Sequence, residues 1–162
     1  MKKLFFLFLF VFISCNLFAY ERFDSLFGIE RGMSRTEVKK IAEADNWLLL
    51  SETDSELYFR LSFNKGYLEG FYGVNVPQFV VFFQNGVSGF ILVTDAKEKA
   101  TVDKIINELD KRYGLEYFGI YKNYFTAWKM KLGGNILMSW ETSQSMLTNE
   151  TSEYAQFTIN LN

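Results

Sequence analysis

Carboxylates are the side chains of this sequence best suited to acid–base chemistry, because the chain has no histidine and a single cysteine. They gather at two places. Glu52, Asp54 and Glu56 precede an alternating apolar segment, and Asp95 and Glu98 precede a helical one. Two carboxyl groups about 5–9.5 Å apart, one with a raised pKa, would suit glycoside hydrolysis. Helix capping and loop solvation explain the same residues more simply, so a carboxylate-dependent cell-wall glycan hydrolase is the alternative, and we expect no enzyme.

Other chemistry is excluded by what the chain lacks. The only cysteine, Cys15, lies in the N-terminal segment, so the rest of the chain has neither a thiol nor an imidazole. Disulfides, Cys or Ser–His nucleophiles and His- or Cys-ligated zinc are therefore not expected. Thr53, Asp54 and Glu56 lack the ligand order and turn glycine of a calcium loop. The sequence predicts no catalytic residues, no metal and no cofactor.

The first nineteen residues have the pattern of an export signal. Lys2 and Lys3 precede an unbroken apolar run, residues 4–13. Ten residues span about 15 Å as a helix, half of the ~30 Å hydrocarbon core of a bilayer. A cleavable secretory signal peptide, residues 1–19, fits this pattern better than a membrane span. We expect cleavage after Ala19, one domain over residues 20–162, and a periplasmic or envelope location in a bacterium.

A second processing route stays open. Phe12-Ile13-Ser14-Cys15 resembles a relaxed bacterial lipobox, in which Cys15 would be lipidated and become the first residue. The protein would then be lipid-anchored, and this anchor is the only membrane contact that we expect. One acyl chain alone anchors a protein only marginally. The apolar segment after Cys15 makes a poor tether, and we therefore favour cleavage after Ala19, with an extracellular location as a further alternative.

The charge distribution does not favour nucleic acid as a partner. The chain has 17 basic and 19 acidic residues, for a net charge of −2. The lysines and arginines are scattered among the acids and form no basic block that could follow a phosphate backbone. Aromatic residues make up 19% of the chain, which gives it enough apolar surface to build a core without disulfides.

Two helices are predicted. Ser34 and Glu37 form a capping box that starts a helix over residues 35–44, flanked by Met33 and Val38 as a hydrophobic staple. A second helix is predicted over residues 97–113, with a capping box between Asp95 and Glu98 and a stop at Gly114.

Antiparallel strands are predicted after each helix. Apolar residues alternate over residues 57–64, and an Asn-Gly turn joins segments 79–83 and 87–94. Segments 124–130, 135–140 and 155–161 follow the second helix. The expected fold class is α+β, with two helix-plus-antiparallel-meander units, about 23–94 and 95–162, packed as a two-layer sandwich. Element order alone suggests a tandem duplication.

The start of the first helix resembles a known family pattern. Gly32-Met33-Ser34 followed by Glu37-Val38 is similar to the helix start of the SmpA/OmlA outer-membrane assembly lipoproteins and of the secreted β-lactamase inhibitor protein repeats. The resemblance covers about ten residues, and the Leu-Gly-x-Pro that often closes the family's helix is absent. It implies a two-layer α+β fold and a binding role. A lipid-anchored scaffold in outer-membrane assembly is therefore a further alternative function.

Clustered aromatic side chains are the candidate binding residues. Tyrosine offers contact area with a polar tip, which suits interfaces. One cluster lies among glycines and the other follows the second helix: Tyr67, Phe71 and Tyr72, then Tyr117, Phe118 and Tyr121. In segments 79–83 and 90–93 both strand faces are apolar, so either a second layer covers Val80, Phe82, Phe90 and Leu92 or part of the sheet awaits a partner. We expect a non-catalytic protein that binds another protein or an envelope component.

Overall fold

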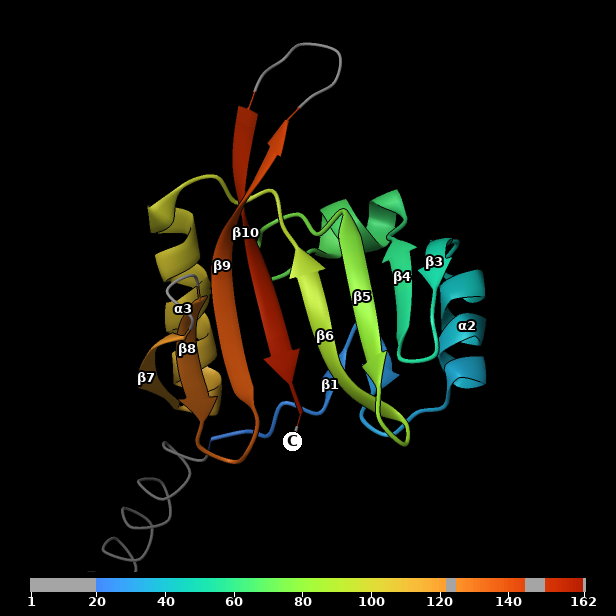
Figure 1. Cartoon of the computed structure of the whole chain (residues 1–162), viewed down its shortest axis with the longest axis horizontal. Coiled ribbons are helices and arrows are strands. Elements are labelled where there is room, and N and C mark those ends of the chain that lie inside the picture. Colours follow the sequence, from blue (N-terminus) through green and yellow to red (C-terminus); the bar gives the residue numbers. More distant parts are fainter. Residues whose placement is uncertain (1–19, 122–124, 145–150, 162) are drawn as a thin grey trace, which may run out of the picture.

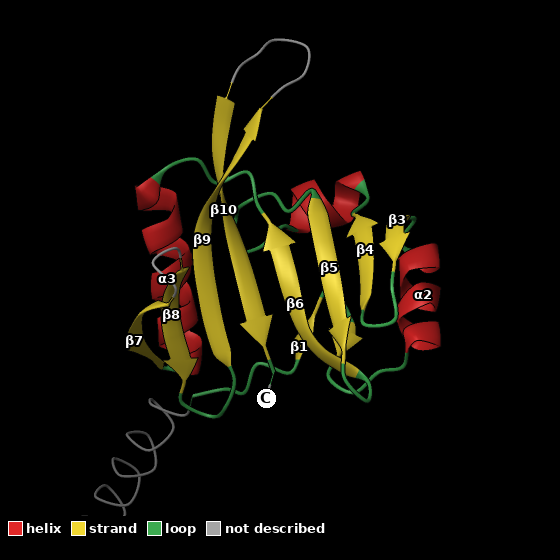
Figure 2. Ribbon diagram, viewed as in Figure 1, coloured by secondary structure: helices red, strands yellow, loops and turns green. Residues whose placement is uncertain are grey.

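The structure is a computed structural model, and it describes residues 20–121, 125–144 and 151–161. The predicted signal peptide and Cys15 lie outside the described residues. Eight antiparallel strands form one sheet in the order β3-β4-β5-β6-β10-β9-β8-β7 (Figure 1). The predicted α+β class is confirmed, with the sheet as the dominant element (Figure 2). The strands are β3 (Leu48–Glu52), β4 (Glu56–Arg60), β5 (Gln78–Phe83), β6 (Val87–Val93), β7 (Leu115–Tyr121), β8 (Phe125–Met130), β9 (Asn135–Gln144) and β10 (Thr151–Asn160).

Helix α2 (Arg35–Ala44) begins and ends where the sequence predicts. Both hydrogen bonds of the capping box are present: the Ser34 backbone N–H donates to Glu37 Oε2 at 2.8 Å, and the Glu37 N–H donates to Ser34 Oγ at 3.4 Å. Gly32 has a φ of +83°, which favours glycine, and its N–H donates to the Val87 carbonyl at 2.9 Å. The Val87 N–H donates in turn to Met33 O at 2.9 Å. The Gly-Met-Ser motif therefore both starts the helix and fixes it to the start of β6.

Helix α3 (Lys99–Tyr113) also carries the predicted apolar stripe. Val102, Ile105, Leu109 and Tyr113 are buried, and Gly114 ends the helix in the left-handed conformation. The predicted capping box between Asp95 and Glu98 is wrong. The Asp95 carboxylate accepts hydrogen bonds from the Asn75 backbone N–H (3.2 Å) and side-chain amide (2.5 Å), so it joins two loops instead of capping the helix.

Both helices pack on the same face of the sheet. Two rows of registered side chains cross five strands on that face, and every member is buried. They are Phe59, Phe79, Leu92, Phe157 and Met138, and Leu57, Val81, Phe90, Ile159 and Ile136. Val38 of α2 and Ile105 of α3 belong to the same core cluster as these rows. One continuous core therefore lies between the helices and one face of the sheet.

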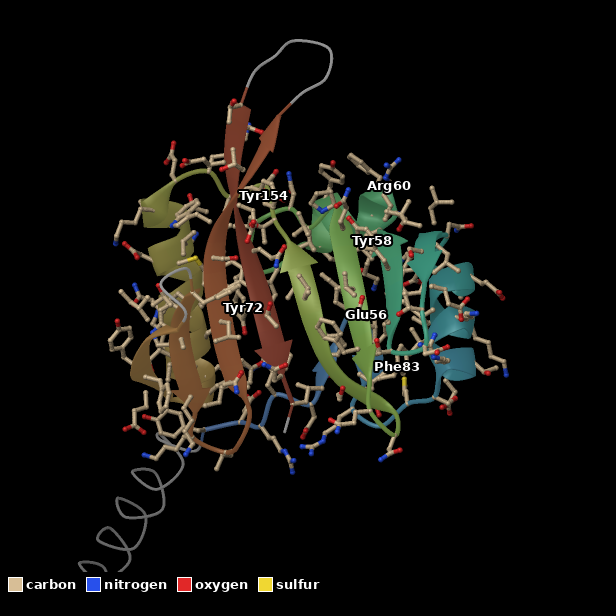
Figure 3. All side chains as sticks on the ribbon, in the orientation of Figure 1. Glu56, Tyr58, Arg60, Tyr72, Phe83 and Tyr154 are labelled. Atoms are coloured by element: carbon tan, nitrogen blue, oxygen red, sulfur yellow. The ribbon has the colours of Figure 1, made fainter. Side chains whose placement is uncertain are left out.

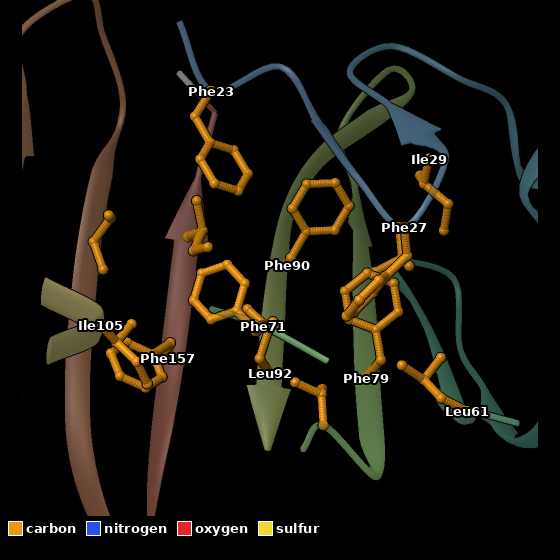
Figure 4. Close-up of a cluster of buried hydrophobic side chains, with 14 of the residues drawn as sticks. Phe23, Phe27, Ile29, Leu61, Phe71, Phe79, Phe90, Leu92, Ile105 and Phe157 are labelled. Atoms are coloured by element: carbon orange, nitrogen blue, oxygen red, sulfur yellow. The ribbon is translucent and has the colours of Figure 1, made fainter. Parts of the chain in front are cut away.

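Aromatic rings fill the middle of this core (Figure 4). Phe79 stacks on Phe90, with ring centroids 5.4 Å apart, and Phe27 and Trp47 meet Phe79 edge-on at 5.3 and 6.0 Å. Phe27 comes from the turn between the short strands β1 (Ser25–Leu26) and β2 (Ile29–Glu30). Burying each such ring contributes about 1.5–3 kcal/mol, which explains how the sheet is stable without disulfides.

The two halves of the sheet have matching strand registers. They meet where β6 pairs with β10, and around the pair Ile91–Thr158 the core residues Phe90 and Leu92 correspond to Phe157 and Ile159. Counting outward along the ladders, both edge strands carry a one-residue register shift, at Leu50 in β3 and at Phe118 in β7. These two shifts fall at corresponding positions.

Several segments differ from the predictions. The sequence pattern does not indicate strands at β3 and β7, and the alternation over residues 57–64 predicts too late an end for β4. Strand β4 ends at Arg60, and a π-helical turn, η1 (Asn64–Glu69), lies between it and β5. The alternation over residues 57–64 fails at Phe63, which is 66% exposed. Strand β10 begins at Thr151, before the predicted Ala155.

Replacing Ser34 with alanine should lower the free energy of unfolding by about 0.5–2 kcal/mol, because the cap of α2 is lost. Urea denaturation measures this change. Thr36→Ala, at an exposed position of the same helix, is the matched control and should cost less than the Ser34 variant. Equal effects of the two substitutions would contradict the role of the capping box.

Candidate functional site

The face of the sheet that points away from the helices is the candidate site, and we call it the open face. Its central row runs across six strands as registered neighbours on one side of the sheet. The row consists of Tyr58, Val80, Ile91, Thr158, Leu137 and Ala127. Except for Ala127, which is buried, these side chains are half-buried. This row gives the open face an apolar middle.

Mostly polar side chains flank the central row, with Val93, Phe82 and Gly89 as the exceptions. On one side lie Arg60, Gln78, Val93, Gln156 and Ser139, again as registered neighbours, and on the other Glu56, Phe82, Gly89, Asn160 and Asn135. Asn160 donates a hydrogen bond to the Asn135 side-chain oxygen at 2.7 Å, and Ser139 donates to Glu141 at 2.8 Å. An apolar middle with hydrogen-bonding groups around it is the composition of a protein-binding surface.

The phenol of Tyr58, on the open face, has a raised pKa. Its hydroxyl donates a hydrogen bond to Gln78 Oε1. Burial raises the pKa of the Tyr58 phenol, the Tyr154 phenol adds to this rise, and Arg60 opposes it. Tyr58, Arg60 and Tyr154 lie toward the same end of the sheet, and Glu56 lies toward the other (Figure 3). The raised pKa keeps the Tyr58 phenol protonated at neutral pH; its proton is donated to Gln78, so its oxygen can accept a hydrogen bond from a partner.

A hollow lies where the open face approaches strand β7. Its volume is about 510 Å³, and Phe118, Leu137 and Asn160 are among its lining residues. Phe118 occupies the register shift of β7, so its side chain comes from the edge strand while Leu137 comes from the central row. The hollow therefore links one predicted aromatic residue to the open face.

The aromatic residues predicted to bind a partner do not form one site. Tyr67 is exposed on η1 and stacks on Phe63, with ring centroids 5.4 Å apart, whereas Tyr117 and Phe118 lie on edge strand β7, at the far end of the sheet from β4. Phe71 is 3% exposed and packs against Phe157 in the core, so it cannot contact a partner in this conformation. Tyr72 is half-buried, and the Tyr121 side chain lies outside the described residues.

The residues that build the open face were only partly indicated by the sequence. Of the four apolar residues singled out in segments 79–83 and 90–93, Phe90 and Leu92 are fully buried beneath the helices. Val80 and Phe82 are half-buried on the open face. Strict alternation along each strand separates the two sets, but both sets are apolar, so the sequence could not show which one the helices cover.

In each acidic cluster one carboxylate, Glu52 or Asp95, makes structural contacts. Glu52 accepts hydrogen bonds from Lys39 at 2.7 Å and Arg35 at 3.2 Å, and the bond from Lys39 is the main cause that lowers the pKa of its carboxyl. A general acid needs the opposite shift. Arg35 also donates a hydrogen bond to the Thr53 carbonyl. This oxygen of segment 53–56 is therefore bonded to a guanidinium. Within the described ranges, no group of three or more His, Cys, Asp or Glu side chains converges as a metal site.

Comparisons with known proteins do not assign a family. No protein-family model matches the chain, and neither a curated protein nor a solved structure matches it. Among the helices of the described residues, none is long and apolar enough to cross a membrane.

The stability of the protein should fall above pH 10. Burial, followed by a hydrogen bond with Tyr72, raises the pKa of the Tyr113 phenol well above its ordinary value of 10.0. Between pH 10 and the pKa in the folded state only the unfolded chain loses this proton, so the free energy of unfolding falls by up to about 1.4 kcal/mol per pH unit.

Denaturation in urea between pH 8 and pH 11 checks this prediction. Tyr113→Phe should make the alkaline slope shallower, with a remaining contribution from Tyr58, whose pKa is also raised. Tyr117→Phe removes an exposed tyrosine and is the control. An unchanged slope in the Tyr113 variant would contradict the assignment.

Proposed function

We propose that this chain is an exported, non-catalytic binding protein, which recognises another protein or an envelope component through the open face. The observation that carries this proposal is a broad sheet surface that neither α2 nor α3 covers, since both helices belong to the core on the opposite side. A sheet face that only meets water usually alternates to fully polar residues. Here Val80, Ile91 and Leu137 occupy its middle.

The chemical composition of the open face supports a protein partner. Tyr58 and Tyr154 bring rigid contact area with a polar tip, and Gln78 and Gln156 bring side-chain amides that donate and accept hydrogen bonds. The charged residues, Arg60 and Glu56 among them, have mixed signs, which favours no strongly charged ligand. The apolar side chains are half-buried rather than fully exposed, as expected for a surface that is stable in water until a partner binds.

We further infer that the fold arose by tandem duplication of a unit with one helix and four strands. The two units lie side by side in the sheet, so their helices form one layer and their strands form the other. Matching registers support this inference, because Leu50 and Phe118 occupy corresponding register shifts. So does the position of a left-handed residue before each edge strand, Asn46 with φ +55° and Gly114 with φ +62°. An experimental structure with the two shifts at different positions would contradict it.

Kinship with the SmpA/OmlA lipoproteins and the β-lactamase inhibitor protein repeats remains a proposal. It is supported by the motif Gly32-Met33-Ser34, whose glycine conformation and cap bonds have specific structural roles, and by the order of helix and strands. The lipid-anchored scaffold in outer-membrane assembly is the form of this proposal that requires a lipid on Cys15.

Mass spectrometry of the processed protein from a bacterial host tests the proposed export. We expect a chain that starts at Tyr20, since the segment after Cys15 is too apolar and short for a lipoprotein tether. An acylated N-terminal Cys15 would instead favour the anchored scaffold. An unprocessed chain recovered from the cytoplasm would contradict export altogether.

Crosslinking in intact cells tests the open face. A photo-reactive phenylalanine in place of Tyr58 should capture a specific partner, whereas the same residue in place of Tyr67, which is exposed on η1, should not. With the purified partner, Thr158→Arg should weaken binding at least tenfold, because a bulky charge then lies in the central row. Lys40→Glu, at an exposed position of α2, is the control. Binding that is insensitive to Thr158→Arg would rule out the open face.

A further inference from the structure

The two edge strands of the sheet carry exposed apolar side chains. Among the described residues, three large apolar side chains are exposed on each edge strand: Leu48, Leu49 and Leu50 on β3, and Tyr117, Phe118 and Ile120 on β7. The latter three are 60, 78 and 67% exposed, more than any of the leucines on β3. Natural sheets usually protect their edges with charges, proline or short strands, because an unpaired strand invites pairing with another chain.

Strand β3 is the better protected of the two edges. Glu52 at its end binds both Lys39 and Arg35 of α2, which places two cations beside the strand. Strand β3 is also shorter, with five residues against seven in β7. In β7 the only charged residue is Glu116. The edge formed by β7 is therefore the less protected one.

The backbone of β7 has hydrogen-bonding groups that point away from β8. The Leu115 N–H donates to Asp110 Oδ1 at 2.7 Å rather than to β8, so it points outward. Because backbone groups alternate along an antiparallel strand, the N–H and C=O of Tyr117 point outward as well. In the sheet, β7 has a neighbour on one side only. The Leu115 N–H is already bonded to Asp110, whereas the outward groups of Tyr117 are available to a further strand.

The register shift at Phe118 indicates which strand fits. Tyr117 pairs with Trp128 and Gly119 pairs with Ala127. Phe118 is therefore an extra residue of β7 at this point. A regular strand would lose its register here, whereas a second β7 brings the same extra residue to the same place. With a two-fold axis between Phe118 and Gly119, Tyr117 faces Ile120 and Glu116 faces Tyr121 of the second copy, and each of these pairs lies on one face of the sheet. In that arrangement the acidic side chain does not meet its own copy, which would be destabilising.

We propose that β7 is a self-association edge, at which two copies of this chain pair antiparallel about a two-fold axis near Phe118. Three highly exposed apolar side chains from each copy become covered. The axis of an antiparallel strand pair is perpendicular to the sheet, so the two open faces lie on the same side of the joined sheet. The proposal does not depend on what the open face binds, but it would make any such binding bivalent.

Sedimentation velocity over a micromolar concentration series tests this proposal on the protein purified after a host has processed the complete chain. The wild-type protein should be a dimer in equilibrium with monomer. Phe118→Lys places one lysine from each copy beside the two-fold axis, and the repulsion between them should raise the dissociation constant at least tenfold. Since Phe118 is highly exposed, thermal denaturation should show that this variant is folded as stably as the wild type.

Two control variants separate β7 from the other exposed apolar residues. Leu132→Lys changes the turn between β8 and β9, and Leu49→Lys changes the opposite edge. Both should remain dimers. A monomeric wild type, a Phe118→Lys dimer of unchanged affinity, or dissociation of the Leu49→Lys variant would each overturn the proposal. Species larger than a dimer would also overturn it, because they would indicate head-to-tail pairing of β3 with β7.

Discussion

The pairing of β6 with β10 is the interaction on which the rest of the structure depends. Five residue pairs join the two halves of the sheet there, and Phe90, Leu92, Phe157 and Ile159 all point from these strands into the core. The two rows of buried side chains are continuous only because this pairing has the correct register. A one-residue slip of β10 against β6 would turn Phe157 and Ile159 toward the open face and Thr158 toward the helices. The core and the candidate site are therefore fixed by the same register.

Local signals predicted the parts of the fold that local chemistry determines. The capping box of Ser34 and Glu37 gives the bounds of α2, and the Asn-Gly turn gives the β5–β6 hairpin, where Asn85 and Gly86 both have positive φ. The edge strands escaped prediction because β3 and β7 each contain a register shift, which breaks alternation. Asp95 escaped too: its partner, Asn75, is twenty residues away and is not visible in a helix-start pattern.

In the candidate site, too, the sequence indicated only some of the residues, because the others depend on distant contacts. Aromatic composition pointed to Tyr117 and Phe118, which are exposed, but also to Phe71, which is in the core. Segment 79–83 is apolar on both faces, so its sequence gives no sign of which face the helices cover. Only the placement of α2 and α3 leaves Val80 and Phe82 on the uncovered side. Tyr58 and Thr158 come from strands far apart in the sequence, and their meeting in one row follows from strand order.

The position of β10 at the end of the described chain affects how the protein can fold. Strand β6 (Val87–Val93) pairs on one side with β5, its neighbour in sequence, and on the other with a strand some 65 residues later. Such distant contacts form slowly because a long loop must close first. Until residues 151–160 are available, the first half keeps a long apolar strand without a second neighbour. A chain that is still being synthesised is exposed to mispairing in this state, and the time before the last strand arrives is its most vulnerable period.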